Sequence, residues 1–169
     1  MKTKIVKYFL TSFATATLFV AAATQYAVHA QDVEGPASDS DNTMVGAWET
    51  TVTPRNCENG EQIAPSFNGV ITFNKGGTVA EFGANPATPH RTPGHGIWTS
   101  LGRRNSMRFT FIPLTPTGVP IGRMRVTQHG ELSKSGDEST SSGYFELTSL
   151  GGVVLATGCS TAIAVRLTF

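Results

Sequence analysis

The sequence predicts an all-β domain, an eight-stranded antiparallel up-and-down barrel closed by pairing of the first and last strands. Short runs rich in Val, Ile, Thr and Phe alternate with Gly, Pro and Asn, and no part of the domain keeps a helical period. The first and last runs can also pair in one antiparallel register that faces Trp48 with Arg166 and brings Cys57 close to Cys159. An even number of strands lets the first and last strands run in opposite directions, and eight are expected here. Since pairing of these two strands removes the exposed sheet edges, we expect a closed barrel, with an open sandwich as the alternative.

The first part of the chain has the pattern of a signal peptide over residues 1–30. Lysines lie near the start, Phe9–Ala23 is apolar, and Val28-His29-Ala30 ends the segment in the small-x-small pattern of a signal peptidase site, with cleavage expected before Gln31. The apolar stretch is shorter than the ~20 residues that a spanning helix needs, so no membrane span is expected after cleavage. Residues 31–43 are acidic and small, which predicts a disordered leader. The barrel domain is expected to cover residues 44–169. We therefore expect a secreted or periplasmic protein.

Charge and cysteine content narrow the function further. Loss of Lys2, Lys4 and Lys7 with the signal peptide would change the formal net charge from +1 to −2, which gives no reason to expect nucleic acid or an anionic membrane as a partner. Both cysteines lie in the mature part, and disulfides persist outside the cytoplasm, so a Cys57–Cys159 disulfide is expected; two buried thiols are the alternative. Two cysteines without His-rich spacing do not complete a zinc site.

Four strands are expected in the first half of the domain, where β-prone residues lie between turn signals. They cover Gly46–Thr53, Phe67–Asn74, Thr78–Phe82 and His95–Leu101. The first strand places Trp48 and Val52 on the same side and should end at Pro54. The second and third are joined at Gly76–Gly77, where glycine supplies the positive φ angles of a tight hairpin. Prolines and glycines make residues 83–96 the longest irregular stretch of the domain.

Four more strands follow, again separated by turn residues. They cover Ser106–Leu114, Ile121–Leu132, Glu138–Thr148 and Val153–Thr168. In the fifth strand Phe109 and Phe111 share one face. In the sixth strand Gln128 and Met124 share one face, and Arg123 and Arg125 lie on the other, which indicates that this other face is in contact with water. The last strand is long, and we expect a bulge at Gly158.

Two short segments resemble a known family. Gly46-Ala47-Trp48 at the start of the first strand, with Arg166 near the end of the last, is similar to the signature of the lipocalins and the wider calycin superfamily. The resemblance implies that Arg166 packs over the Trp48 indole at a closed end, where a cation–π contact contributes about 1 kcal/mol or more. It also implies a barrel that holds a small apolar or amphipathic molecule. The Thr-Asp-Tyr-like motif of typical lipocalins and their helix before the last strand are absent from the sequence. The stretch PHRTPGHGIW, residues 89–98, instead resembles a motif of uncharacterised secreted bacterial proteins.

The most concentrated chemistry lies in this proline-rich stretch. Its side chains are His90, Arg91, His95 and Trp98. If the stretch lies beside a barrel mouth, its cationic groups can meet a polar or anionic head group while Trp98 lines an apolar wall. Phe109 and Phe111 complete the candidate ligand-binding set, and Met107 and Phe145 are further inward candidates. Alternatively, Pro and Gly only shape a long turn, and the His side chains hydrogen-bond to local backbone.

The sequence gives little support to catalysis. No nucleophile motif or phosphate-binding loop is present, so hydrolase, nucleotide-binding and cofactor-dependent functions are not expected. An acid–base enzyme would need a carboxylate in an apolar interior, and the candidates in strands are Glu81, Glu131 and Glu146. An isomerase or cyclase, similar to the allene oxide cyclase type, is therefore a second hypothesis. A non-catalytic protein-interaction module, such as an inhibitor, is a third. A metal site from His90 and His95 would need a further ligand such as His129 or Glu81, and the spacing of these residues gives no reason to expect a metal site.

Overall fold

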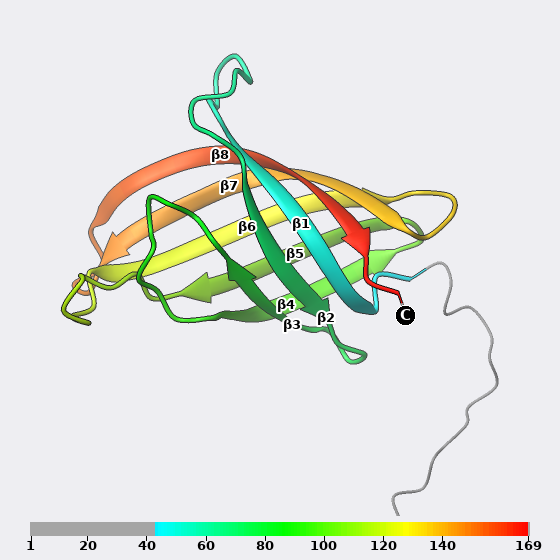
Figure 1. Cartoon of the computed structure of the whole chain (residues 1–169), viewed down its shortest axis with the longest axis horizontal. Helices are drawn as coiled ribbons and strands as arrows, with labels where there is room; N and C mark the ends of the chain where they lie inside the picture. Colours follow the sequence, from blue (N-terminus) through cyan, green and yellow to red (C-terminus); the bar gives the residue numbers. More distant parts are fainter. Residues whose placement is uncertain (1–42, 169) are drawn as a thin grey trace, which may run out of the picture. The chain divides into compact units, whose positions relative to one another are not determined.

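The protein is described by a computed structural model over residues 43–168, which form a closed antiparallel barrel (Figure 1). The strands are β1 Gly46–Arg55, β2 Phe67–Phe73, β3 Thr78–Gly83, β4 Gly94–Leu101, β5 Arg104–Phe111, β6 Gly122–Leu132, β7 Glu138–Ser149 and β8 Val154–Arg166. Each strand pairs with the next along the chain, and β8 pairs with β1. The predicted all-β, eight-stranded closed barrel is therefore confirmed. The expected signal peptide and leader lie outside the described residues, apart from Thr43.

The closing pair of strands has the register that the sequence predicts. Trp48 of β1 lies opposite Arg166 of β8, and the pairing continues to Arg55, which lies opposite Cys159. The Arg166 guanidinium lies 4.2 Å from the centroid of the Trp48 ring, and a disulfide joins Cys57 to Cys159 with their Cα atoms 5.2 Å apart. We call the two ends of the barrel the Trp48 end and the disulfide end. The disulfide indicates an oxidising compartment outside the cytoplasm.

The connections differ between the two ends. The Trp48 end carries the short turns, including the β2–β3 hairpin, in which Gly76 and Gly77 have φ angles of 99° and 88° as expected. The longer connections, residues 56–66, 84–93 and 112–121, lie at the disulfide end, together with the β7–β8 turn (Figure 1). No helix in residues 43–168 is both long enough and apolar enough to cross a membrane.

The interior of the Trp48 end is filled by large apolar side chains. Trp48 is fully buried, and its indole N–H donates a hydrogen bond to the Met44 carbonyl at 3.0 Å. Phe73 packs edge-on against the Trp98 ring, with the ring centroids 5.4 Å apart. Leu132 is also almost completely buried here. This packing leaves any interior space to the disulfide end.

The expected end of the first strand at Pro54 is wrong, because β1 continues to Arg55. Pairing of β1 with β2 ends at Val52, whereas pairing with β8 continues through Pro54. The Pro54 carbonyl accepts a hydrogen bond from the Ile63 N–H at 3.2 Å, outside the β1–β2 ladder. Proline is tolerated here because no ladder hydrogen bond requires its missing N–H.

The expected bulge at Gly158 is also misplaced. The register irregularity of β7 and β8 lies between Leu147 and Thr148, where the partner residue changes from Ala156 to Val154. Gly158 itself pairs regularly with Phe145, and a Cβ atom at Gly158 would lie 2.4 Å from the Phe145 ring. The glycine therefore makes room for an inward aromatic side chain and does not interrupt the ladder.

Candidate functional site

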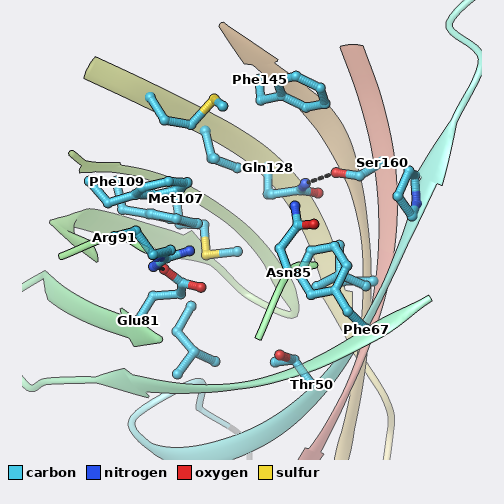
Figure 2. A pocket seen from close by; sticks show the side chains of 17 residues that line it. Thr50, Phe67, Glu81, Asn85, Arg91, Met107, Phe109, Gln128, Phe145 and Ser160 are labelled. Atoms are coloured by element: carbon cyan, nitrogen blue, oxygen red, sulfur yellow. Dashed lines mark hydrogen bonds and ion pairs between the residues drawn. The ribbon is translucent and has the colours of Figure 1, made fainter. Parts of the chain in front are cut away.

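A cavity of about 120 Å³ lies in the interior, toward the disulfide end of the barrel. Figure 2 shows the 17 side chains that line it. The apolar majority consists of Val52, Pro54, Phe67, Ile71, Met107, Phe109, Phe111, Met124, Val126, Phe145 and Ala162. The polar members are Thr50, Glu81, Asn85, Arg91, Gln128 and Ser160. An apolar lining with few polar groups is typical of a small-molecule site.

The period-two alternation of the strands explains which side chains reach this cavity. On β5 the inward positions carry Met107, Phe109 and Phe111, which are bulky and line one part of the wall. On β8 the inward positions carry Ser160 and Ala162, which are small. Large side chains facing small ones leave interior space that the Trp48 end, with its larger side chains, does not have.

One polar group of the cavity is a buried ion pair between Glu81 of β3 and Arg91 of the connection 84–93 (Figure 2). The Arg91 side chain is 4% exposed and the Glu81 side chain 12%. The Arg91 guanidinium also lies over the Phe111 ring, 3.6 Å from its centroid, and donates to the Thr92 carbonyl at 3.1 Å. Arg91 is thus held by ionic, cation–π and hydrogen-bonding contacts at once.

Two glycines make room for the Glu81 carboxylate. A Cβ atom at Gly94 would lie 2.6 Å from one carboxylate oxygen, and a Cβ at Gly83 would lie 2.8 Å from the other. The connection that carries Arg91 is fixed by backbone hydrogen bonds to the segment after β5, with the Leu114 N–H donating to the His90 carbonyl at 2.8 Å. The backbone therefore positions both members of the ion pair.

The buried position of Glu81 changes its acidity. Removal from water raises the pKa of the Glu81 carboxyl above its ordinary value of 4.5, and the hydrogen bond and positive charge of Arg91 partly offset this rise. Glu81 can therefore hold a proton at a higher pH than an exposed glutamate does.

The second polar group is the Gln128 amide of β6 with the Ser160 hydroxyl of β8 (Figure 2). The Gln128 Nε2 donates to Ser160 Oγ at 2.8 Å, and Gln128 is only 4% exposed. The Gln128 Oε1 accepts no hydrogen bond from any residue of the described part of the chain. A buried carbonyl in this state costs on the order of 1–3 kcal/mol, so this oxygen is an unused acceptor in a side chain that lines the cavity.

The structure brings together only part of the predicted ligand-binding set. Arg91, Phe109 and Phe111 line the cavity, as do the further candidates Met107 and Phe145. Trp98 does not line it: its ring packs on Phe73 toward the Trp48 end, and its N–H donates to the Asn74 carbonyl at 3.0 Å. His90 and His95 are exposed and do not line it either.

The other ionisable groups considered for chemistry lie outside the cavity. Glu131 pairs with Arg103 at 2.7 Å in an exposed contact, and Glu146 lies 3.9 Å from Arg125. His129 shares a hydrogen bond of 2.9 Å with the Ser106 hydroxyl on the outer face of the sheet. Within residues 43–168, no three His, Cys, Asp or Glu side chains lie close enough together to hold a metal ion.

Sequence reasoning missed the roles of Gln128 and Ser160 in the cavity and considered Glu81 only as a catalytic or metal-binding group. The alternation that placed Gln128 on the same face as Met124 was a usable signal, because a polar residue on an inward face needs a partner. No protein-family model matches the chain, and no curated protein or solved structure is significantly similar to it. The proposed function therefore rests on the geometry of the cavity.

Proposed function

We propose that the chain is an exported, lipocalin-like barrel that binds a small apolar or amphipathic molecule in its interior cavity without changing it chemically. The observation that carries the proposal is the cavity itself, apolar over most of its wall and polar at the Glu81–Arg91 and Gln128–Ser160 pairs. Its Trp48–Arg166 closure is the feature shared with lipocalins, and its disulfide supports a secreted or periplasmic location.

The size of the cavity limits the ligand. A cavity of about 150 Å³ in another protein binds benzene, so the smaller volume of 120 Å³ here suits a molecule of about six or seven non-hydrogen atoms. Toluene and phenol are therefore suitable probes. A long fatty acid is not expected to fit in the cavity.

The direct test fills the cavity from its small side. Ala162→Phe places a ring in the interior, whereas Ala47→Phe places the same ring at an exposed position on the outer face of β1. Titration of toluene and phenol, followed in two-dimensional NMR spectra, should show binding to the wild type and to Ala47→Phe, and loss of binding in Ala162→Phe. Native mass spectrometry of freshly purified protein should show a bound mass of this size. Absence of binding to the wild type, or equal binding to both variants, contradicts the proposal.

A second candidate function is an isomerase or cyclase acting in the same cavity. It is favoured by the buried Glu81 carboxyl, whose raised pKa suits proton transfer and whose Arg91 partner lies beside it. A small cyclic enone incubated with the protein in deuterated water would report such proton transfer as deuterium uptake next to its carbonyl group. Uptake that is lost in Glu81→Gln supports the enzyme, and the same slow uptake with and without protein excludes it for this substrate class.

A further inference from the structure

The cavity presents an acceptor and a donor next to each other. The Gln128 Nε2 donates to Ser160 Oγ at 2.8 Å, which leaves the buried Gln128 Oε1 without a donor from the described residues, in a side chain that lines the cavity. Ser160 is buried and lines the cavity, and its oxygen accepts the Gln128 hydrogen bond, so its own proton can be donated to another group. The pair thus offers one acceptor and one donor to a ligand.

A hydroxyl group matches this pair. It donates one hydrogen bond and accepts others, so it can donate to Gln128 Oε1 while accepting from Ser160 Oγ. Such a ligand removes the cost of the buried carbonyl, whereas a hydrocarbon of the same shape leaves it in place. Sites built around a buried polar group discriminate strongly against ligands that lack the matching group.

The charges in the cavity disfavour an anion. Arg91 is the only cationic side chain among the lining residues, and its guanidinium is already held by Glu81 and by the Thr92 carbonyl. The nearest compensation for a ligand carboxylate is therefore already taken, and the Glu81 carboxylate would repel it. An anion would have to enter an apolar space without a partner, which is costly.

We propose that the cavity selects a small neutral alcohol, with phenols as the best fit, whose hydroxyl binds Gln128 and Ser160 while its ring lies among Met107, Phe109 and Phe145. The inference rests on the proposed binding function of the cavity. It adds a class of ligand and assigns the polar recognition to two residues on neighbouring parts of the wall (Figure 2).

The test compares phenol with toluene, which has nearly the same shape but no hydroxyl. Gln128→Met keeps the length of the side chain and removes the amide oxygen, and Gln62→Met makes the same change at an exposed position of the connection 56–66. Dissociation constants for both probes give a selectivity, defined as Kd for toluene divided by Kd for phenol. The two probes differ in their free energy of transfer from water, but this difference is the same for every variant. It therefore cancels when the ratio is compared between variants.

We expect Gln128→Met to lower this selectivity at least tenfold relative to the wild type, and Gln62→Met to leave it within twofold. Ser160→Ala should lower it at least threefold, and this small change serves as the test if Gln128→Met does not fold. Benzoate should bind the wild type at least tenfold more weakly than phenol. If both probes bind but selectivity is the same in all variants, or if benzoate binds as well as phenol, the alcohol proposal is wrong while the binding function stands. If neither toluene nor phenol binds, both proposals fail.

Discussion

Arg166 should contribute more to the stability of the barrel than any arginine on its outer face. Its guanidinium lies 4.2 Å from the Trp48 ring centroid and donates hydrogen bonds to three carbonyls: Gly136 at 2.9 Å, Val45 at 2.8 Å and Thr43 at 2.5 Å. These contacts tie the β6–β7 turn and the segment before β1 to the end of β8. Replacement by methionine keeps much of the aliphatic length and removes all four interactions.

The size of the effect follows from these contacts. A hydrogen bond from a charged donor contributes about 1.5–3 kcal/mol, and a cation–π contact with a desolvated ring contributes about 1–2 kcal/mol. The total is smaller than the simple sum, because carbonyls at the barrel end regain water when Arg166 is removed. We therefore expect Arg166→Met to lower the free energy of unfolding by about 3–5 kcal/mol, a large share of the roughly 5–15 kcal/mol typical of a domain.

Urea unfolding followed by tryptophan fluorescence measures this change, since Trp48 lies directly beneath the guanidinium. Arg125→Met is the matched control: Arg125 lies on the outer face of β6, 3.9 Å from Glu146, where removal should cost less than about 1 kcal/mol. A loss below about 1 kcal/mol in Arg166→Met, or equal losses in the two variants, would refute the view that this residue closes the barrel.

Three other changes test separate parts of the structure. Replacing Cys57 and Cys159 together by serine should lower the free energy of unfolding by about 3–5 kcal/mol, because the disulfide joins positions 102 residues apart, and chemical reduction of the wild type should match it in urea titrations. Gly158→Ala should cost about 1–3 kcal/mol through contact with the facing aromatic ring, whereas Gly151→Ala, whose Cβ meets no atom closer than 3.8 Å, should change the melting temperature little. Burial raises the pKa of Glu81 above 4.5, so the folded protein keeps this proton to higher pH than the unfolded chain does. The free energy of unfolding should therefore fall as pH rises from 4.5 through the folded pKa, by at most about 1.4 kcal/mol per pH unit. Glu81→Gln should remove this part of the slope, and parallel pH profiles for the two proteins would contradict it.

The closure of the barrel could be predicted because two independent residue pairs constrain the same register. Trp48 with Arg166 and Cys57 with Cys159 lie at opposite ends of the closing strands, and a shift by one residue would turn every side chain of β8 to the other face. Strand ends were less predictable, because they depend on which neighbour a backbone group faces. Pro54 illustrates this, since it still pairs with β8 after the pairing of β1 with β2 has ended at Val52.

The candidate site could be predicted only where alternation decides it. Phe109 and Phe111 point inward because β5 is regular, and the same rule places Gln128 inward on β6. The ion pair of Glu81 and Arg91 could not be found this way, because the conformation of the connection 84–93 places Arg91. That conformation depends on contacts with the segment after β5, which are distant in sequence.

The disulfide belongs to the site as well as to the barrel. Cys159 directly precedes Ser160, and the two side chains point to opposite faces of β8, so the bond to Cys57 holds the outer side of the strand next to the position whose inner side carries the hydroxyl. The same strand keeps the Gln128–Ser160 hydrogen bond at 2.8 Å, and a small loosening of β8 would break it. Reduction should therefore weaken selectivity for phenol over toluene even at temperatures where the reduced barrel remains folded. The oxidising compartment that the disulfide requires is then also the compartment in which the proposed binding site is complete.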